Sequence, residues 1–267
     1  MKQLAELMSL QGRVALITGG AGYLGMAMAE ALAELGCGLC LLDREETTLV
    51  RAADAIGKEW GVSVQTLAVD LENEAARSEV PGKIQDRFGR LDILINNAGF
   101  VGDSQLQGWV VPFEEQRVDT WRRALEVNLS AVFHLCQILS PMLKAVGKGA
   151  IVNISSIYGV VGPDLRLYEG TKMGNPAAYA ASKGGMVQLT RWLATVLAPH
   201  VRVNCISPGG VSRGQPPEFV ERYVARTPLG RMGTEEDFKG AIAYLASDLS
   251  SWVTGENLMV DGGWTAW

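Results

Sequence analysis

The sequence predicts an α/β fold in which helices cover both faces of a doubly wound parallel sheet. Short apolar runs alternate with longer amphipathic runs, as in strands joined by crossover helices. Leu39–Leu42 and Ile93–Ile95 are apolar without interruption, which indicates strands buried on both faces. A glycine-rich turn, Thr18–Gly25, separates the first strand from the first helix, as in Rossmann-type folds. The expected sheet has about seven strands.

The first half of the chain predicts a βαβαβ unit that continues into one more helix and strand. In chain order, the expected elements are the strand Arg13–Thr18, the helix Leu24–Leu35, the strand Cys37–Asp43, the helix Glu45–Trp60, the strand Val62–Val69, the helix Glu72–Phe88 and the strand Leu91–Asn96. Because a helix separates each strand from the next, the strands are expected to run parallel.

The second half continues this alternation with two interruptions. The expected elements are helices near Thr120–Asn128 and Ala131–Val146, the strand Ala150–Ser155, the helix Ala177–Leu197, and strands near Arg202–Ile206 and Asn257–Val260. Glycine and proline crowd Phe100–Glu115 and Tyr158–Pro176, which predicts long loops. Loops after strand ends commonly carry specificity, so residues 100–115 and 157–176 are the expected substrate loops.

Composition indicates one ordinary globular domain over residues 1–267. Hydrophobic residues make up 48% of the chain and charged residues 20%, and no repeat or Pro/Ser-rich linker divides it. The net charge of −5 and the lack of a basic cluster argue against nucleic acid as a partner. No apolar run approaches the roughly 18 residues of a membrane span, and the N-terminus lacks the apolar core of a secretory signal. The expected location is the cytoplasm.

The cysteines and histidines predict no metal site. Cys37 and Cys40 have a C-x-x-C spacing, but on a strand side chains three residues apart point to opposite faces. No second pair completes a zinc site, and His134 and His200 have no partner at ligand spacing. We therefore expect reduced, buried thiols and structural histidines.

The glycine-rich turn predicts a dinucleotide site. Gly19, Gly22 and Gly25 follow a strand and open a helix, so a pyrophosphate can approach the backbone at the helix N-terminus. Asp43 ends the next strand, where a carboxylate accepts hydrogen bonds from the adenosine ribose and repels a 2′-phosphate, which favours NAD(H) over NADP(H). Arg44 argues the other way, because a guanidinium can pair with that phosphate. Asp43 could also merely begin a turn.

Tyr179 and Lys183 predict hydride-transfer chemistry. They lie four residues apart at the start of a long helical run, so their side chains share one helix face about 5–6 Å apart. The Lys183 ammonium can then favour the phenolate and lower the pKa of Tyr179 toward working pH. A tyrosine tuned in this way can act as a general acid or base. Together with the dinucleotide site, the pair indicates an enzyme that uses a nicotinamide cofactor.

Several motifs, in order along the whole chain, resemble those of the short-chain dehydrogenase/reductase family. They are Asp70, Asn96-Asn97-Ala98-Gly99, Asn128, Ser156, Tyr179 with Lys183, Pro208-Gly209 and Val260-Asp261-Gly262-Gly263. Each is modest alone, but their shared order makes the resemblance specific. It implies a compact single-domain member whose strand order resembles 3-2-1-4-5-6-7.

The resemblance also implies a role for each motif. Tyr179 would exchange a proton with the substrate oxygen, Ser156 would polarise that oxygen, and Lys183 would hold the nicotinamide ribose. Asn128 would anchor a water chain that returns protons to solvent. Ile17 would line the cofactor. The expected cofactor-binding residues are Gly19, Gly22, Tyr23, Leu24, Gly25, Asp43, Arg44, Asp70, Leu71, Asn97, Ala98, Gly99, Tyr179, Lys183, Pro208, Gly209 and Val211.

A second Tyr-x-x-x-Lys pair, Tyr168 with Lys172, competes with this assignment. Gly170 and Pro176 surround it, so no rigid helix can hold the two side chains on one face. Tyr179, in contrast, leads directly into the long helix. We therefore assign the catalytic role to Tyr179 and interpret Tyr168 as a candidate substrate contact.

Three departures from the family pattern limit what carries over. Tyr23 stands where the turn normally has a glycine, which changes the fit of the pyrophosphate. The gap between Ser156 and Tyr179 is longer than usual, so the substrate mouth is expected to be reshaped. Near the sixth strand, Arg213 replaces the expected threonine and leaves Ser212 as a candidate contact to the carboxamide.

Four residues near the expected mouth and the C-terminus keep two interpretations each. Arg166 and Lys172 could bind an anionic substrate such as a sugar nucleotide, or could face solvent. Trp264 and Trp267 are interpreted as packing against a neighbouring subunit, with cofactor stacking as the alternative.

The sequence thus predicts an NAD(H)-linked oxidoreductase that interconverts a secondary alcohol and a ketone, assembled as a homo-oligomer, a tetramer or dimer. The loop around Tyr168 and the ending Asp261–Thr265 resemble family members associated with surface-polysaccharide or flagellin-glycan biosynthesis, which suggests a sugar or sugar nucleotide as substrate. A 3-oxoacyl-carrier-protein reductase is the alternative enzyme. A dinucleotide-sensing binding module is the alternative outside enzymes.

Overall fold

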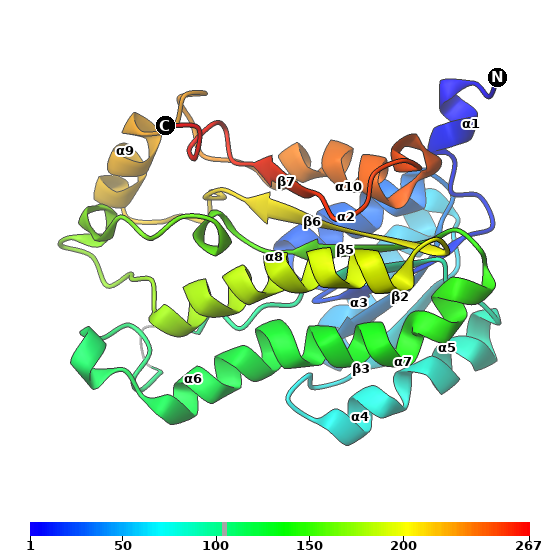
Figure 1. Cartoon of the computed structure of the whole chain (residues 1–267), viewed down its shortest axis with the longest axis horizontal. Coiled ribbons are helices and arrows are strands. Elements are labelled where there is room, and N and C mark those ends of the chain that lie inside the picture. Colours follow the sequence, from blue (N-terminus) through cyan, green and yellow to red (C-terminus); the bar gives the residue numbers. More distant parts are fainter. Residues whose placement is uncertain (103–105) are drawn as a thin grey trace.

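A seven-stranded parallel sheet forms the centre of the computed structural model, which describes residues 1–102 and 106–267 (Figure 1). The strands are β1 (Val14–Thr18), β2 (Gly38–Asp43), β3 (Val64–Ala68), β4 (Ile93–Asn96), β5 (Gly149–Ile154), β6 (Val201–Pro208) and β7 (Asn257–Val260). Their order is β3-β2-β1-β4-β5-β6-β7. The predicted fold class, strand number and strand order are therefore confirmed.

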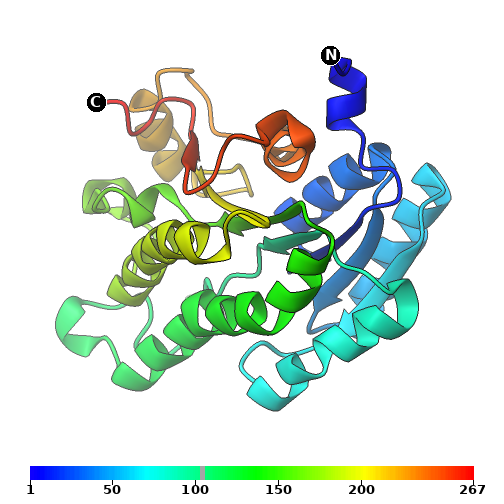
Figure 2. The same cartoon turned by 45° about the vertical axis from the view of Figure 1, so that its right-hand side comes forward.

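Helices cover the sheet on both faces (Figures 1 and 2). On one face lie α2 (Tyr23–Glu34), α3 (Glu46–Trp60) and α10 (Lys239–Ala246), and on the other α4 (Glu74–Ser78), α5 (Val80–Phe88), α7 (Ala131–Ala145) and α8 (Ala177–Leu197). The remaining helices are α1 (Leu4–Met8), α6 (Val118–Leu125) and α9 (Pro217–Ala225). Within the described ranges, no helix is both long enough and apolar enough to cross a membrane.

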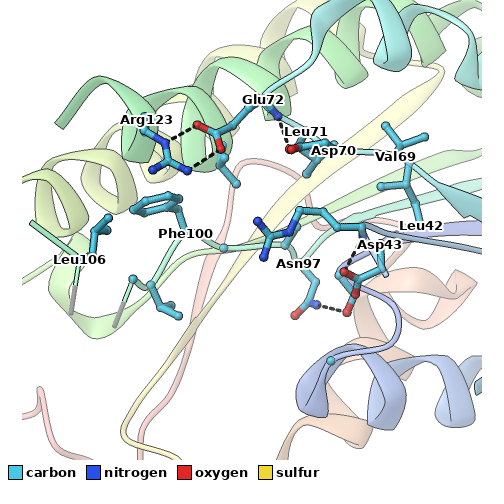
Figure 3. A pocket seen from close by; sticks show the side chains of 18 residues that line it. Leu42, Asp43, Val69, Asp70, Leu71, Glu72, Asn97, Phe100, Leu106 and Arg123 are labelled. Atoms are coloured by element: carbon cyan, nitrogen blue, oxygen red, sulfur yellow. Dashed lines mark hydrogen bonds and ion pairs between the residues drawn. The ribbon is translucent and has the colours of Figure 1, made fainter. Parts of the chain in front are cut away.

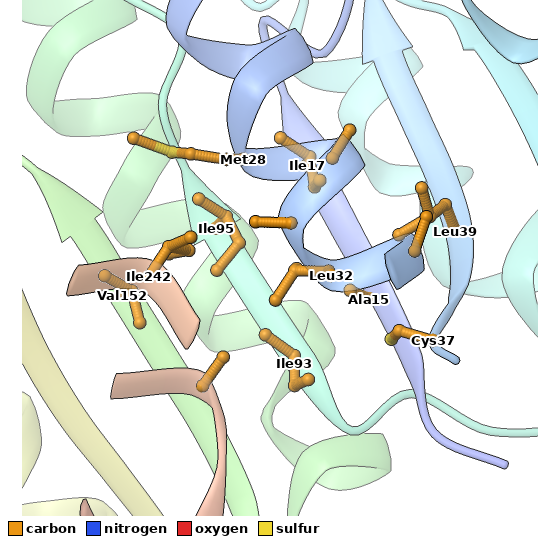
Figure 4. Packing of buried hydrophobic residues seen from close by; sticks show 14 of the residues in the cluster. Ala15, Ile17, Met28, Leu32, Cys37, Leu39, Ile93, Ile95, Val152 and Ile242 are labelled. Atoms are coloured by element: carbon orange, nitrogen blue, oxygen red, sulfur yellow. The ribbon is translucent and has the colours of Figure 1, made fainter. Parts of the chain in front are cut away.

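Two apolar clusters hold the layers together, one on each face of the sheet. In the cluster of Figure 4, Ile17 and Ile95 of the sheet pack with Leu32 of α2 and Ile242 of α10. Leu16, the neighbour of Ile17, belongs to the cluster on the opposite face. Burial of each such side chain contributes about 1.5–3 kcal/mol, so the alternation along every strand fixes the sheet between its helices.

The cysteines follow the same alternation. Cys37 lies in one cluster and Cys40 in the other, as predicted for a C-x-x-C pair on a strand. All four cysteines are buried and free. Burial raises the pKa of the Cys40 thiol to about 12, which keeps this thiol protonated at neutral pH.

The structure differs from the expected helices at two places. The helix expected over Glu72–Phe88 is two helices, because Asn73 caps α4 through its side chain and Pro81 starts a new helix. Proline lacks the N–H that a continuous helix would need. The helices α6 and α7 join without a break through a π-helical turn, Glu126–Ser130.

Three short helices, α1, α9 and α10, were not expected from the sequence. The two expected loops contain only 3₁₀ turns among their described residues, namely Phe113–Glu115, Ile157–Gly159 and Leu165–Tyr168.

Strand register places the motif residues at one edge of the sheet. Thr18 is the partner of Asn96, and Asn96 is the partner of Asn153. The carboxyl ends of β1, β4 and β5 therefore lie side by side. The strand order reverses at β1, because β2 and β3 lie on one side of it and β4 to β7 lie on the other. The crossover connections therefore turn away from each other at this point, which leaves a crevice at the carboxyl edge of the sheet.

Candidate active site

The glycine-rich turn after β1 is packed too tightly for side chains. Gly19 has a positive φ of 63°, and a Cβ on it would lie 2.9 Å from the Cα of Ala98. A Cβ on Gly25 would lie 2.0 Å from the carbonyl oxygen of Gly19. These glycines bring the turn, the start of α2 and the end of β4 within contact distance, which leaves bare backbone facing the crevice.

Hydrogen bonds lock this turn to the segment after β4. The Thr18 hydroxyl accepts from the backbone N–H of Asn97 at 3.1 Å and of Ala98 at 3.0 Å. The Asn97 amide in turn donates to the carbonyls of Thr18 and Gly19, each at 3.1 Å. The side chain of Asn97 thus holds the two loops at a fixed separation on either side of the crevice.

A cavity of about 510 Å³ lies at this edge of the sheet (Figure 3). Nine of the predicted cofactor residues line it, namely Gly19, Gly22, Asp43, Arg44, Asp70, Leu71, Asn97, Ala98 and Gly99. Its volume lies within the range of known ligand pockets, about 300–1,000 Å³. Bare glycine backbone at one end and carboxylates at strand ends suit the pyrophosphate and adenosine of a dinucleotide.

Asp43 points into this cavity from the end of β2 (Figure 3). One carboxylate oxygen accepts from the backbone N–H of Ala21 at 3.3 Å, and the other accepts from that of Arg44 at 2.8 Å. These contacts orient the carboxylate between the turn and the adenosine end. Asp70, after β3, is oriented likewise by the backbone N–H of Glu72 at 2.9 Å.

One wall of the cavity was not found from the sequence. Arg123 of α6 makes a two-pronged ion pair with Glu72, at 2.8 and 2.9 Å, and lies over the ring of Phe100 at 5.2 Å (Figure 3). The Arg123 contact holds the pKa of Glu72 below its ordinary value. Because the two charged residues are far apart in the sequence, no local pattern indicates their pairing.

The remaining predicted cofactor residues lie outside the lining of this cavity. Leu24 and Gly25 are in α2, where Gly25 supports the turn. Tyr23 is 72% exposed, and its ring lies 4.3 Å from the guanidinium carbon of Arg213. At the other side of the site, Pro208 ends β6, Gly209 lines a separate cavity of about 420 Å³, and Val211 pairs with Gly233 in a parallel bridge.

The predicted reacting residues meet beside the cavity. Ser156 follows β5 and is buried, and Tyr179 and Lys183 lie on the first turns of α8. The Lys183 Nζ lies 5.8 Å from the centroid of the Tyr179 ring and donates to the carbonyl of Ile154 at 2.8 Å. A Cβ on Gly99, which lines the cavity, would be 3.8 Å from this Nζ. The lysine therefore connects the tyrosine to the dinucleotide cavity.

The electrostatics of this pair differ from the expectation. Burial raises the pKa of Tyr179, and the neighbouring Ser156 side chain only partly opposes this effect. Burial also lowers the pKa of Lys183 to about 8. The expected lowering of the Tyr179 pKa by Lys183 is thus wrong for the protein alone, because desolvation is the largest influence on the tyrosine and Lys183 is not among the groups that shift it.

Asn128 lies in the π-helical turn between α6 and α7 and is fully buried. Its side-chain oxygen accepts from the N–H of Phe100 at 2.6 Å, and its NH₂ group donates to the Ser182 hydroxyl at 3.0 Å. The side chain therefore links the segment after β4 to α8. Both polar atoms of the amide have protein partners, so Asn128 holds these two segments in fixed positions beside the site.

The competing tyrosine, Tyr168, lies in a 3₁₀ turn that ends before Lys172. Its hydroxyl is hydrogen-bonded to that of Tyr158 at 2.8 Å, and its ring packs on Phe219 at 5.3 Å. Lys172 is exposed. The two residues share no helix, in contrast to Tyr179 and Lys183.

Comparison with known proteins identifies the family. Residues 20–265 match the family model described as enoyl-(acyl carrier protein) reductase. A cis-4-hydroxycyclohexanecarboxylate dehydrogenase of Sinomonas cyclohexanicum is 35% identical, over 95% of this chain and 97% of that protein. The chain therefore belongs to the short-chain dehydrogenase/reductase family.

Solved structures agree with this assignment. A gluconate 5-dehydrogenase of Burkholderia cenocepacia, in complex with NADP and tartrate, has a TM-score of 0.87 at 30% identity, covering 99% of this chain and 100% of that chain. An NAD⁺-bound xylitol dehydrogenase has a TM-score of 0.82 at 32% identity, covering 95% and 99%. The protein is an NAD(P)-dependent oxidoreductase that acts on CH–OH groups, as the sequence predicted.

Proposed function

We propose that this enzyme interconverts a secondary alcohol and a ketone of the sugar or polyol class, with NAD(H) as cofactor and Tyr179 as general acid and base. The observation that carries the proposal is that Tyr179, with Ser156 and Lys183 nearby, lies beside the dinucleotide cavity, whose lining residue Gly99 lies close to the Lys183 Nζ. A bound nicotinamide supplies or accepts the hydride. The side chains then have to bind the substrate oxygen and move one proton.

Ser156 and Tyr179 divide this work. The Ser156 hydroxyl, fixed by the N–H of Tyr158 at 3.2 Å, can hydrogen-bond the substrate oxygen. Tyr179, whose pKa is raised by burial, is protonated at neutral pH and can donate its proton to the oxygen of a ketone that is being reduced. In the oxidative direction, the phenolate oxygen of Tyr179 accepts the proton from the hydroxyl group of the alcohol. Lys183 would hold the nicotinamide ribose through its ammonium.

Asp43 supports the preference for NAD(H). Its carboxylate is held in the cavity by two backbone N–H groups, where it would meet the adenosine ribose. A 2′-phosphate there would face a fixed negative charge. Arg44 lines the same cavity, but it is exposed and its guanidinium has no hydrogen-bond or ion-pair partner among the described residues. We therefore give the repulsion of a 2′-phosphate by Asp43 more weight than its attraction by Arg44.

The substrate class follows from the relatives and from the two loops. The similar structures named above are a gluconate 5-dehydrogenase and a xylitol dehydrogenase, both named for polyhydroxylated substrates. We propose that residues 100–115 and 157–176 form the substrate mouth and that the reaction belongs to carbohydrate biosynthesis, as in surface-polysaccharide or flagellin-glycan formation. Cytoplasmic location fits that role.

A 3-oxoacyl-carrier-protein reductase is the second candidate, favoured by the acyl-carrier-protein description of the matching family model. The two candidates differ in the substrate that turns over. NADH absorbance is therefore followed with polyols, sugar acids, nucleotide sugars and β-ketoacyl thioesters, for the wild type, Tyr179→Phe and Tyr168→Phe.

We expect turnover of a polyhydroxylated substrate, and a loss of about 10²–10⁴-fold in kcat for Tyr179→Phe with NADH binding retained. Tyr168→Phe, the comparison variant from the competing pair, should lose far less of kcat than Tyr179→Phe. Turnover of β-ketoacyl thioesters alone would refute the substrate class, and equal activity of Tyr179→Phe would refute the catalytic assignment.

A further inference from the structure

A cavity of about 560 Å³ lies between the two long loops, outside the dinucleotide cavity. Its lining includes Val101, Gly102 and Val110 of the first loop and Thr171, Lys172 and Gly174 of the second. Val101 and Gly102 also line the dinucleotide cavity, so the two spaces adjoin. Val110 and Tyr179 both pack against the apolar cluster of Trp109, Ala124 and Ala178, so one cluster supports both this cavity and the reacting tyrosine.

The charges on the enlarged loop are not equivalent. Arg166 is committed to Asp164, to which its guanidinium donates two hydrogen bonds of 2.8 Å. Arg226 pairs with the same carboxylate at 2.5 Å. Lys172, in contrast, lines the cavity and makes no ion pair with any described residue. Of the two cations noted in the sequence, only Lys172 is therefore available to a ligand in this cavity.

The rest of the lining leaves little else for a polar ligand to contact. Most side chains there are apolar or absent, and the Thr171 hydroxyl already donates to the carbonyl of Tyr168 at 2.8 Å. The Lys172 ammonium is therefore the main charged group that a ligand in this cavity can contact, and an ammonium binds an anionic group more strongly than a neutral one. The carboxylate of Glu169 lies on the same loop, but Glu169 is not part of the lining.

The loop that carries Lys172 is anchored rather than free. Arg222 of α9 donates to the carbonyl of Glu169 at 2.6 Å, and the ring of Tyr168 packs on Phe219. On the other side of Lys172, a Cβ on Gly174 would lie 2.7 Å from a methyl carbon of Val110, so the two loops touch. A cation on a fixed loop loses less freedom when it binds a ligand.

We propose that Lys172 selects substrates that carry an anionic group, a carboxylate or a phosphate, on the side away from the reacting carbon. This inference rests on the oxidoreductase function proposed above and narrows its substrate class to sugar acids or sugar phosphates rather than neutral polyols. A charge-assisted contact at a half-open site should favour the anion by about tenfold, which corresponds to about 1.4 kcal/mol.

The test compares matched neutral and anionic ligands on the full protein saturated with NADH. Binding of D-glucitol, D-gluconate and D-glucitol 6-phosphate is followed by tryptophan fluorescence, which needs no turnover. The variants are Lys172→Gln, Lys172→Arg and, as a matched control on the same loop, Arg166→Gln. The gluconate and phosphate arms separate the two sources of negative charge.

The wild type should bind at least one of the anions about tenfold more tightly than glucitol. Lys172→Gln should remove this preference without changing glucitol binding, while Lys172→Arg and Arg166→Gln should keep it. Equal affinity for all three ligands, no binding of either anion, or a preference that survives Lys172→Gln would overturn the proposal. Turnover of neutral polyols that depends on Tyr179 would then leave the proposed function standing, so the two failures are distinguishable.

Discussion

At the scale of single residues, burial sets the protonation of the two groups nearest the reaction. The same desolvation raises the pKa of Tyr179 and lowers that of Lys183, because it penalises the phenolate in one case and the ammonium in the other. The protein alone therefore favours a protonated tyrosine, and it lowers the pKa of Lys183 to about 8, which still leaves the lysine mostly charged at pH 7. Such a pair suits proton donation to a carbonyl and carries a measurable cost in stability.

Lys183→Met should stabilise the free protein at pH 7. The lysine pKa falls from 10.5 in the unfolded chain to about 8 in the folded protein, which corresponds to a cost of about 3 kcal/mol. Loss of the hydrogen bond to the Ile154 carbonyl offsets about 1 kcal/mol, which leaves a gain of about 2 kcal/mol. Urea unfolding measures this difference.

The pH dependence of this gain has a definite sign. Below pH 8 the lysine is protonated in both states and the cost is fully present. Between pH 8 and 10.5 the unfolded chain binds more protons, so wild-type stability rises with pH. Because the mutant also lacks the hydrogen bond to Ile154, its advantage should vanish at about pH 10 and reverse above it. A gap between the two proteins that stays constant over this range would show that Lys183 is not desolvated.

Asp43→Asn should shift the enzyme toward NADP(H). The substitution keeps the shape of the side chain and its place beside Ala21 but removes the charge that would repel a 2′-phosphate. We expect kcat/KM with NADPH to rise about tenfold and that with NADH to fall. Adding Arg44→Ala should cancel the rise, since the guanidinium is the available phosphate partner. An unchanged NADH/NADPH ratio would contradict the proposed role of Asp43.

At the scale of elements, the site depends on close contacts that only part of the sequence reveals. The strands and the long helices follow from apolar patterning, and α8 has the predicted bounds, Ala177–Leu197. The short helix α9 was missed because its nine residues offer too little periodicity. The π-helical turn at Asn128 was missed because its cause is tertiary, namely the buried contacts of the Asn128 amide with Phe100 and Ser182.

The candidate site shows the same division. Residues tied to strand ends, such as Asp43 and Asn97, lie at the cavity where the motifs predicted them. The ion pair of Arg123 with Glu72, and the lack of an ion pair for Lys172 among the described residues, depend on which side chains meet across distant segments. The spacing of residues in the sequence does not predict such contacts. Tyr23 lies outside the cavity lining, and its contact with Arg213 joins two segments that are far apart in the sequence, so no local pattern could predict it.

Gly25→Ala tests the tightest contact in the turn. The added Cβ would lie 2.0 Å from the Gly19 carbonyl oxygen, so the turn or the start of α2 must move. We expect a loss of about 1–3 kcal/mol in the free energy of unfolding and much weaker NADH binding. Gly22→Ala is the matched control, because its Cβ would lie 3.3 Å from the same oxygen and should cost less than about 1 kcal/mol in unfolding. Equal effects of the two variants would show that the contact is not limiting.

At the scale of the whole molecule, α8 packs against α6 and α7 on one face of the sheet (Figure 2). These three helices leave large apolar side chains exposed. Trp121 of α6 is 37% exposed, Phe133 of α7 is 43% exposed and Trp192 of α8 is 53% exposed. Scattered apolar residues are ordinary on protein surfaces, but aromatic residues on adjacent elements are typical of subunit interfaces. We propose that this helical layer forms the interface of the homo-oligomer predicted from the sequence.

Trp192→Glu should therefore weaken the oligomer. A carboxylate placed in an apolar interface loses its hydration without gaining a partner. A central tryptophan commonly contributes about 2 kcal/mol or more to association. The concentration at which the oligomer dissociates should therefore rise roughly thirtyfold. Size-exclusion chromatography with light scattering over a dilution series measures the shift. The matched control is Trp60→Glu at the end of α3, where the tryptophan is 37% exposed on a helix that covers the opposite face of the sheet. A monomeric wild type, or dissociation of Trp60→Glu instead of Trp192→Glu, would place the interface elsewhere or remove it.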